Sequence, residues 1–109
     1  MKMTLNTKKL VGEDERMCVY ITRATEDMEH MLHDYSPRGL SLMGWKVFLV
    51  EHKDDGERRY VAFDERDVPR FDAGDIYEFD LMMRLKLMEL EDSLDLRNIA
   101  ETGEVPQMR

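Results

Sequence analysis

The longest helical pattern in the chain runs from Asp75 to Glu101 and carries apolar residues on two sides. Successive residues of an α-helix are rotated by about 100°, which sorts these residues into two stripes. The first stripe, expected to face the core, comprises Ile76, Phe79, Met83, Leu87, Leu90 and Leu94. The second stripe, on roughly the opposite side, comprises Tyr77, Leu81, Leu85, Met88, Leu96 and Ile99. A helix that is apolar on two sides needs a cover on each of them.

The ends of this helix are also readable from the sequence. Asp75 is suited to the N-cap, and Glu78 stands three residues later, as in a capping box. Gly103 is a typical helix stop, and Pro106 prevents continuation. At 1.5 Å per residue such a helix spans about 37 Å, whereas a domain of this size has a radius of gyration of only about 13 Å. The helix is therefore about as long as the domain.

The sequence leaves three alternatives for what covers the second stripe. They are the same helix of a second copy, a different protein, and the first helix of the same chain. Leaving five or six large apolar side chains in water is costly, since burying each contributes roughly 1.5–3 kcal/mol. We favour the second copy, because it needs no further component and gives a symmetric dimer.

The length of 109 residues predicts a single domain. We expect an N-terminal arm at residues 1–16, either mobile or laid along a sheet edge, an α+β domain at 17–103 and a C-terminal tail at 104–109. The net charge is −8, but 16 basic residues are interspersed with 24 acidic ones. This pattern is typical of a mixed, solvated surface.

Charge and cysteine content argue against several classes of protein. The local basic pairs, Lys8-Lys9 and Arg58-Arg59, are too small for a phosphate-binding patch, so we predict no direct nucleic-acid binding. The single cysteine, Cys18, excludes an intramolecular disulfide and a cysteine-built zinc site within one chain. There is no signal-peptide pattern and no apolar run of about 18 residues, which predicts a cytoplasmic protein that does not enter a membrane.

The rest of the chain predicts three strands and one shorter helix. The strands are expected at residues 17–22, 45–52 and 58–63, and the helix at 25–35 with Thr25 as its cap. Asp55-Gly56 is a hairpin signal between the last two strands. The element order is β-α-β-β-α, and we predict an α+β fold in which a three-stranded sheet carries both helices on one face and the long helix is C-terminal.

The two faces of the predicted hairpin are both apolar. A two-residue loop would place Val50 opposite Val61 and Phe48 opposite Phe63, and we take this face as the inner one. The other face is then a second candidate binding surface, with Trp45, Val47, Leu49 and Tyr60. Tryptophan and tyrosine are favoured residues at interfaces.

Two clusters suggest metal chemistry at first sight. Glu29, His30, His33 and Asp34 share the helix at 25–35, but its apolar stripe of Met28, Met31, Leu32 and Tyr35 points all four away from the core. Asp64, Asp67 and Asp72 lie in a charged loop without EF-hand spacing. We therefore predict no metal site and no cofactor, while a site shared by His30 and His33 across two subunits stays open.

The function predicted from the sequence is binding and not catalysis. There is no phosphate-binding glycine loop and no activated nucleophile. We expect a small acidic regulator or inhibitor of another protein, which forms a homodimer through the second stripe of the long helix. The acids around this stripe favour a basic partner protein: Glu78, Glu89, Asp92 and Asp95. One alternative is an inhibitor that presents its acidic surface to a nucleic-acid-binding protein in place of phosphates, as virus-encoded inhibitors of host factors do. Another is a small enzyme with a metal or a dimer-interface site.

Overall fold

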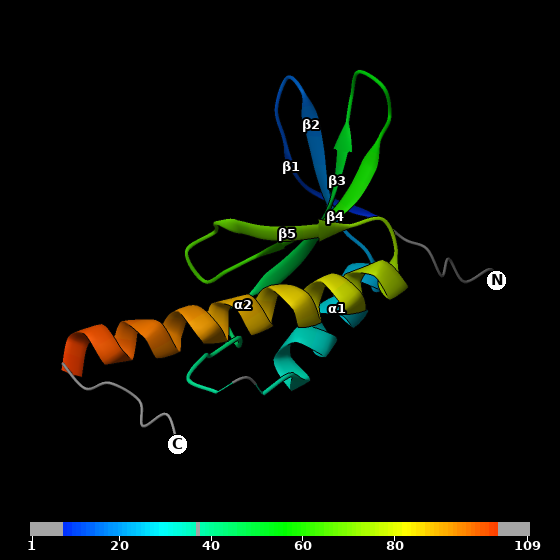
Figure 1. Ribbon diagram of the computed structural model, residues 1–109. Coiled ribbons are helices and arrows are strands. Elements are labelled where there is room, and N and C mark those ends of the chain that lie inside the picture. The colour runs from blue at the N-terminus through cyan, green and yellow to red at the C-terminus, as the bar shows by residue number, and fades with distance from the viewer. Residues whose placement is uncertain (1–7, 37, 103–109) are drawn as a thin grey trace.

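The part of the chain that the structure describes folds into one antiparallel sheet that carries two helices. The computed structural model (Figure 1) describes residues 8–36 and 38–102, and for residues 94–102 it describes the backbone alone. In chain order the elements are β1 (Lys9–Glu13), β2 (Met17–Ile21), α1 (Arg23–Asp34), β3 (Lys46–His52), β4 (Arg58–Phe63), β5 (Pro69–Ala73) and α2 (Ile76–Thr102). The sheet has five strands in the order β1-β2-β3-β4-β5, and each strand is antiparallel to its neighbours.

The α+β class agrees with the prediction, but the three-stranded sheet was wrong, since the sheet has five strands. The N-terminal segment contributes β1, which lies along the free edge of β2 and has a register shift between Leu10 and Gly12. This irregularity interrupts the alternation of side chains, which explains why no period is visible there. The segment expected to be a charged loop contains β5, in which only Phe71 and Ala73 are buried. Two buried residues among charged neighbours, after an initial proline, are a weak strand signal.

The register of the β3–β4 hairpin also differs from the prediction. Phe48 lies opposite Val61, not opposite Phe63. The connection is longer than two residues, because the amide of His52 donates to the carbonyl of Glu57 (2.8 Å) and Gly56 donates back to His52 (2.9 Å). Gly56 takes a left-handed conformation with φ 73°, which suits glycine. The shift is by two residues, so each side chain keeps the face that the predicted register gave it.

The helices cover the sheet face that the sequence analysis took as the outer one. The core joins residues from both helices, the α1–β3 connection and strands β3, β4 and β5: Met28, Leu32, Leu42, Trp45, Val47, Ala62, Phe71, Ala73, Phe79, Met83 and Leu87. Both helices lie on the same side of the sheet (Figure 1). The predicted inner face, with Phe48, Val50, Val61 and Phe63, is thus the one that neither helix covers.

Each helix begins with a side-chain cap. Thr22, and not Thr25, is the N-cap of α1, since its hydroxyl accepts from the Thr25 amide (3.1 Å) while the Thr25 hydroxyl accepts from the Thr22 amide (2.9 Å). At the start of α2, Asp75 accepts from the Glu78 amide (2.8 Å), as predicted. The Glu78 carboxylate reaches back to the amide of Gly74 (3.2 Å), one residue beyond the usual capping-box partner.

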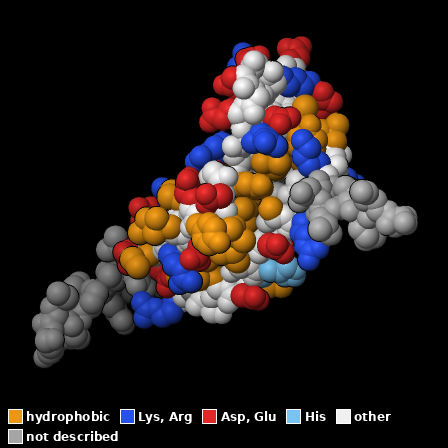
Figure 2. Space-filling model, turned by 90° about the vertical axis from the view of Figure 1, so that its right-hand side faces the viewer, with side chains coloured by type: hydrophobic (Ala, Val, Ile, Leu, Met, Phe, Trp, Pro, Cys, Tyr) orange, Lys and Arg blue, Asp and Glu red, His pale blue; other side chains and the backbone are white. Residues whose placement is uncertain are grey.

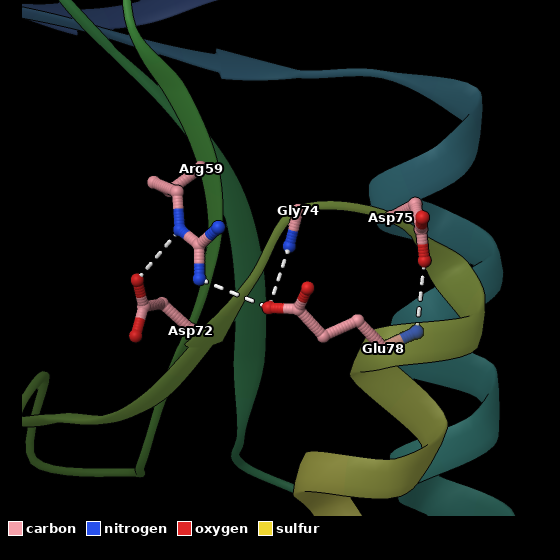
Figure 3. A network of polar contacts seen from close by, with 5 residues as sticks. All are labelled: Arg59, Asp72, Gly74, Asp75 and Glu78. Carbon is pink, nitrogen blue, oxygen red and sulfur yellow. Dashed lines mark hydrogen bonds and ion pairs between the residues drawn. The ribbon is translucent and has the colours of Figure 1, made fainter.

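An ion-pair network ties the start of α2 to the sheet (Figure 3). The Arg59 guanidinium of β4 bonds the carboxylate of Asp72 on β5 (2.9 Å) and that of Glu78 on α2 (3.0 Å). Both carboxylates raise the pKa of Arg59, with the hydrogen bond to Asp72 as the largest cause. Such partly exposed pairs contribute little stability individually. They do orient α2, and with it the face that α2 turns outward.

Candidate interaction surface

The outward face of α2 presents four large hydrophobic side chains to solvent. Tyr77 is 84% exposed, Leu81 57%, Leu85 49% and Met88 59%. The rotation of the helix is set by its buried residues on the other side, since Phe79, Met83 and Leu87 are at most 2% exposed. The structure therefore places four of the six residues of the predicted stripe on one exposed face, which we call the α2 outer face. The other two, Leu96 and Ile99, lie outside the part of the chain whose side chains are described.

Charge pairs border the α2 outer face. Arg84 bonds Asp80 one turn earlier (3.2 Å), and Lys86 lies 3.5 Å from Glu89. Each pair is locally neutral, although the whole chain carries −8. Figure 2 shows the same mixture on one side of the molecule, where patches of hydrophobic side chains alternate with acidic and basic ones.

The second candidate surface from the sequence was wrong. Trp45, Val47 and Leu49 are at most 4% exposed and lie beneath the helices, and the half-buried Tyr60 packs against the core. The helices therefore cover Trp45 and Val47, whereas Leu49 and Tyr60 are reached only through a pocket beside the first turn of α1, so the four side chains do not form an open surface for a protein partner. Their aromatic and aliphatic character reflects burial within the molecule.

The sheet face that neither described helix covers is a surface that the sequence analysis missed. Its half-buried apolar side chains are Met17, Val19, Ile21, Phe48, Val61 and Phe63. We call it the open sheet face. Phe48 and Phe63 meet edge to face, with ring centroids 5.6 Å apart. The signal for the covered face is in β5. Its two buried residues, Phe71 and Ala73, lie opposite Ala62 and Tyr60 of β4 and so mark the face that the helices cover.

The histidine cluster on α1 does not have the arrangement predicted for it. Glu29 and His33 do not point into solvent, because both reach the backbone at the start of β3. A carboxylate oxygen of Glu29 accepts from the Val47 amide (2.9 Å), and Nε2 of His33 lies 3.0 Å from the Trp45 carbonyl oxygen. Within the described residues no three His, Cys, Asp or Glu side chains are grouped as a metal site would require.

The three aspartates of the charged loop are also separated. Asp72 pairs with Arg59, whereas Asp64 is 6% exposed and organises the β4–β5 turn. One oxygen of Asp64 accepts from the amides of Arg66 (2.8 Å) and Val68 (3.0 Å), and the other accepts from Arg70 Nε (3.1 Å). Burial raises the pKa of Asp64, but these donors outweigh it and the net direction is downward.

A pocket of about 420 Å³ lies beside this turn. Trp45, Asp64, Arg70, Ser41 and Ser93 are among its lining residues. The carboxylate of Asp64 is already occupied by its three donors, and no histidine lies among the described lining residues. Asp64 is therefore not free to act as a general base for either serine.

Comparison with known proteins finds no family model, no curated protein and no solved structure that matches this chain. In the described part of the chain, neither helix combines the length and hydropathy that crossing a bilayer requires. Cys18 is half-buried and free.

Proposed function

We propose that this protein is a cytoplasmic binding protein that dimerises through the α2 outer face and regulates or inhibits another protein without catalysing a reaction. The observation that supports this proposal is the exposure of Tyr77, Leu81, Leu85 and Met88 on one side of α2. The free cysteine fits a reducing compartment.

Burial of the α2 outer face would favour association strongly. Fully burying one large apolar side chain contributes roughly 1.5–3 kcal/mol, and a half-exposed one contributes roughly half of that. Four such residues on each of two copies give a total on the order of 8 kcal/mol, before the cost of association is subtracted. That total is enough to offset much of the lost translational and rotational freedom.

The ion pairs beside the α2 outer face are compatible with a second copy of the chain. The charges cancel within each of the pairs Asp80–Arg84 and Lys86–Glu89, so these four residues add no net repulsion between two copies. A two-fold axis across α2 would place each apolar residue against the apolar stripe of the other copy. Each of the two copies then contributes the same face to the interface.

The test is the solution mass of the untagged full chain, measured by light scattering on a sizing column, for wild type and Leu85→Glu. We expect a wild-type dimer and a folded monomer for the variant. The substitution counts twice in a symmetric interface, so the dimer dissociation constant should rise at least about 100-fold. Met43→Glu is the matched control, since Met43 is 69% exposed but lies outside α2, and it should leave the dimer intact.

A monomeric wild type at micromolar concentration would refute the dimer. If Leu85→Glu remains a dimer, the dimer interface does not lie on the α2 outer face. If Leu85→Glu does not fold, Leu81→Glu is the second variant, because Leu81 is more exposed (57%).

A further inference from the structure

A second pocket lies on the helix-bearing face of the sheet, beside the first turn of α1. Its volume is about 330 Å³, within the range typical of small-molecule sites. It is lined by Lys8, Thr22, Arg23, Ala24, Leu49, Arg58 and Tyr60. We call it the basic pocket. It shares no residue with the α2 outer face, so it does not depend on the proposed dimer.

The lining of this pocket is cationic in an otherwise acidic molecule. Lys8, Arg23 and Arg58 come from three separate segments, the residue before β1, the first turn of α1 and the start of β4. No acidic side chain is among the described lining residues, whereas the whole chain carries −8. Like charges gathered around one cavity repel each other, and a bound anion would relieve this repulsion.

The three cations are only weakly engaged by the protein itself. Arg58 has a long contact with Glu51 (3.8 Å), and the Lys8 ammonium lies 4.5 Å from the centre of the Tyr20 ring. Among the described residues Arg23 has no ion-pair partner. Most of their hydrogen-bond donors are therefore available to a ligand.

Apolar side chains complete the lining. Leu49 is buried (4% exposed), and Tyr60 is half-buried and packs against the core. Basic groups together with an aliphatic and an aromatic side chain suit a ligand that carries both an anionic group and an apolar ring. Guanidinium groups match the geometry of phosphate oxygens, because they donate two parallel hydrogen bonds.

We propose that the basic pocket binds a small organic phosphate ester. Its phosphate lies among Lys8, Arg23 and Arg58, and its ring packs against Leu49 and Tyr60. The basic residues, too few for a nucleic-acid surface, are sufficient for a single phosphate group.

The test is titration of the ¹⁵N-labelled full chain with phenyl phosphate in phosphate-free buffer, followed by amide chemical shifts. We expect saturable shifts at Arg23, Ala24 and Tyr60, and binding at least about tenfold weaker for inorganic phosphate, which lacks the ring. The double variant Arg23→Glu/Arg58→Glu should lose at least about tenfold in affinity. Lys46→Glu, an exposed cation outside the pocket, should bind as wild type does.

Two results would overturn the proposal. One is the absence of saturable shifts at millimolar phenyl phosphate. The other is binding that Lys46→Glu weakens as much as the double variant does, since that would be a response to net charge alone. Equal affinity for inorganic phosphate would overturn the assignment of the ring to Leu49 and Tyr60. If the charge-reversed variant does not fold, Arg23→Gln/Arg58→Gln replaces it and should show the same loss.

Discussion

At the scale of single residues, Asp64 shows how one side chain stabilises the β4–β5 turn and β5, which have few apolar residues of their own. Its carboxylate holds the amides of Arg66 and Val68 and the guanidinium of Arg70. Asp67, within the same turn, has a left-handed backbone with φ 63°. The bonds to Asp64 offset the strain of that conformation and allow β5 to return along β4.

We predict that Asp64→Ala lowers the free energy of unfolding by about 2–3 kcal/mol at pH 7, because two amides and a guanidinium lose a buried acceptor. Asp64→Asn should cost less, since the amide oxygen can still accept from both backbone amides. Urea unfolding of the three proteins measures the difference.

The contribution of Asp64 to the free energy of unfolding should depend on pH. The pKa of Asp64 is lower in the folded protein, so its ionised carboxylate stabilises the fold above the unfolded-state pKa of about 3.9. This contribution is lost as the pH falls through the folded-state pKa. The difference in free energy of unfolding between wild type and Asp64→Ala should therefore become smaller in acid. A difference that is constant from pH 7 to pH 3 would show that the carboxylate charge contributes nothing to stability.

At the scale of elements, α1 does more than cover the sheet. The pairing of β2 with β3 runs only from Leu49 to His52, so the backbone of β3 before Leu49 has no strand beside it on that side. Glu29 and His33 take the place of that strand by bonding the Val47 amide and the Trp45 carbonyl. The polar side of α1 thus satisfies backbone groups that would otherwise be buried without partners.

We expect Glu29→Ala to lower the free energy of unfolding by about 1–3 kcal/mol, because the buried Val47 amide loses its acceptor. His30→Ala is the control on the same helix, since His30 is exposed, and its effect should stay within about 0.5 kcal/mol. Chemical denaturation compares the two variants. Equal losses would show that the bond between Glu29 and β3 does not contribute.

At the scale of the whole molecule, the sheet has two apolar faces and only two described helices, both on one face. The covered face holds the fully buried residues Val47 and Ala62, whereas the open sheet face keeps Phe48 and Phe63 half-buried. Stability should therefore depend much more on one face than on the other.

This asymmetry predicts different costs for two phenylalanine truncations. Phe79→Ala should lower the free energy of unfolding by about 3–5 kcal/mol, because Phe79 is 0% exposed between α2 and the sheet. Phe48→Ala should cost roughly 1–2 kcal/mol, since its ring is only partly removed from water. Urea unfolding in a Leu85→Glu background excludes a contribution from dimer dissociation. A larger cost for Phe48→Ala would contradict the assignment of the core to the helix-bearing face.

The sequence alone determined the elements that have a strong local period. Patterns within one segment predict the strands near residues 17–22, 45–52 and 58–63, the two helices, the cap at Asp75 and the stripe that groups Tyr77, Leu81, Leu85 and Met88 on one side of the long helix. The exposure of this stripe to solvent follows only from the tertiary structure. Such patterns depend on the 3.6-residue and two-residue periods of the backbone, which need no knowledge of distant residues.

Only the tertiary structure decided which face of the sheet is the core, because β3 and β4 are apolar on both sides. That choice depends on β5, whose inner residues Phe71 and Ala73 extend the face of Val47 and Ala62. Glu29 and His33 gained their roles in the same way, from contact with a strand more than ten residues away. The basic pocket, too, exists only because the fold joins three separate segments. Contacts between distant segments leave no periodic pattern in the sequence, so only the folded chain shows them.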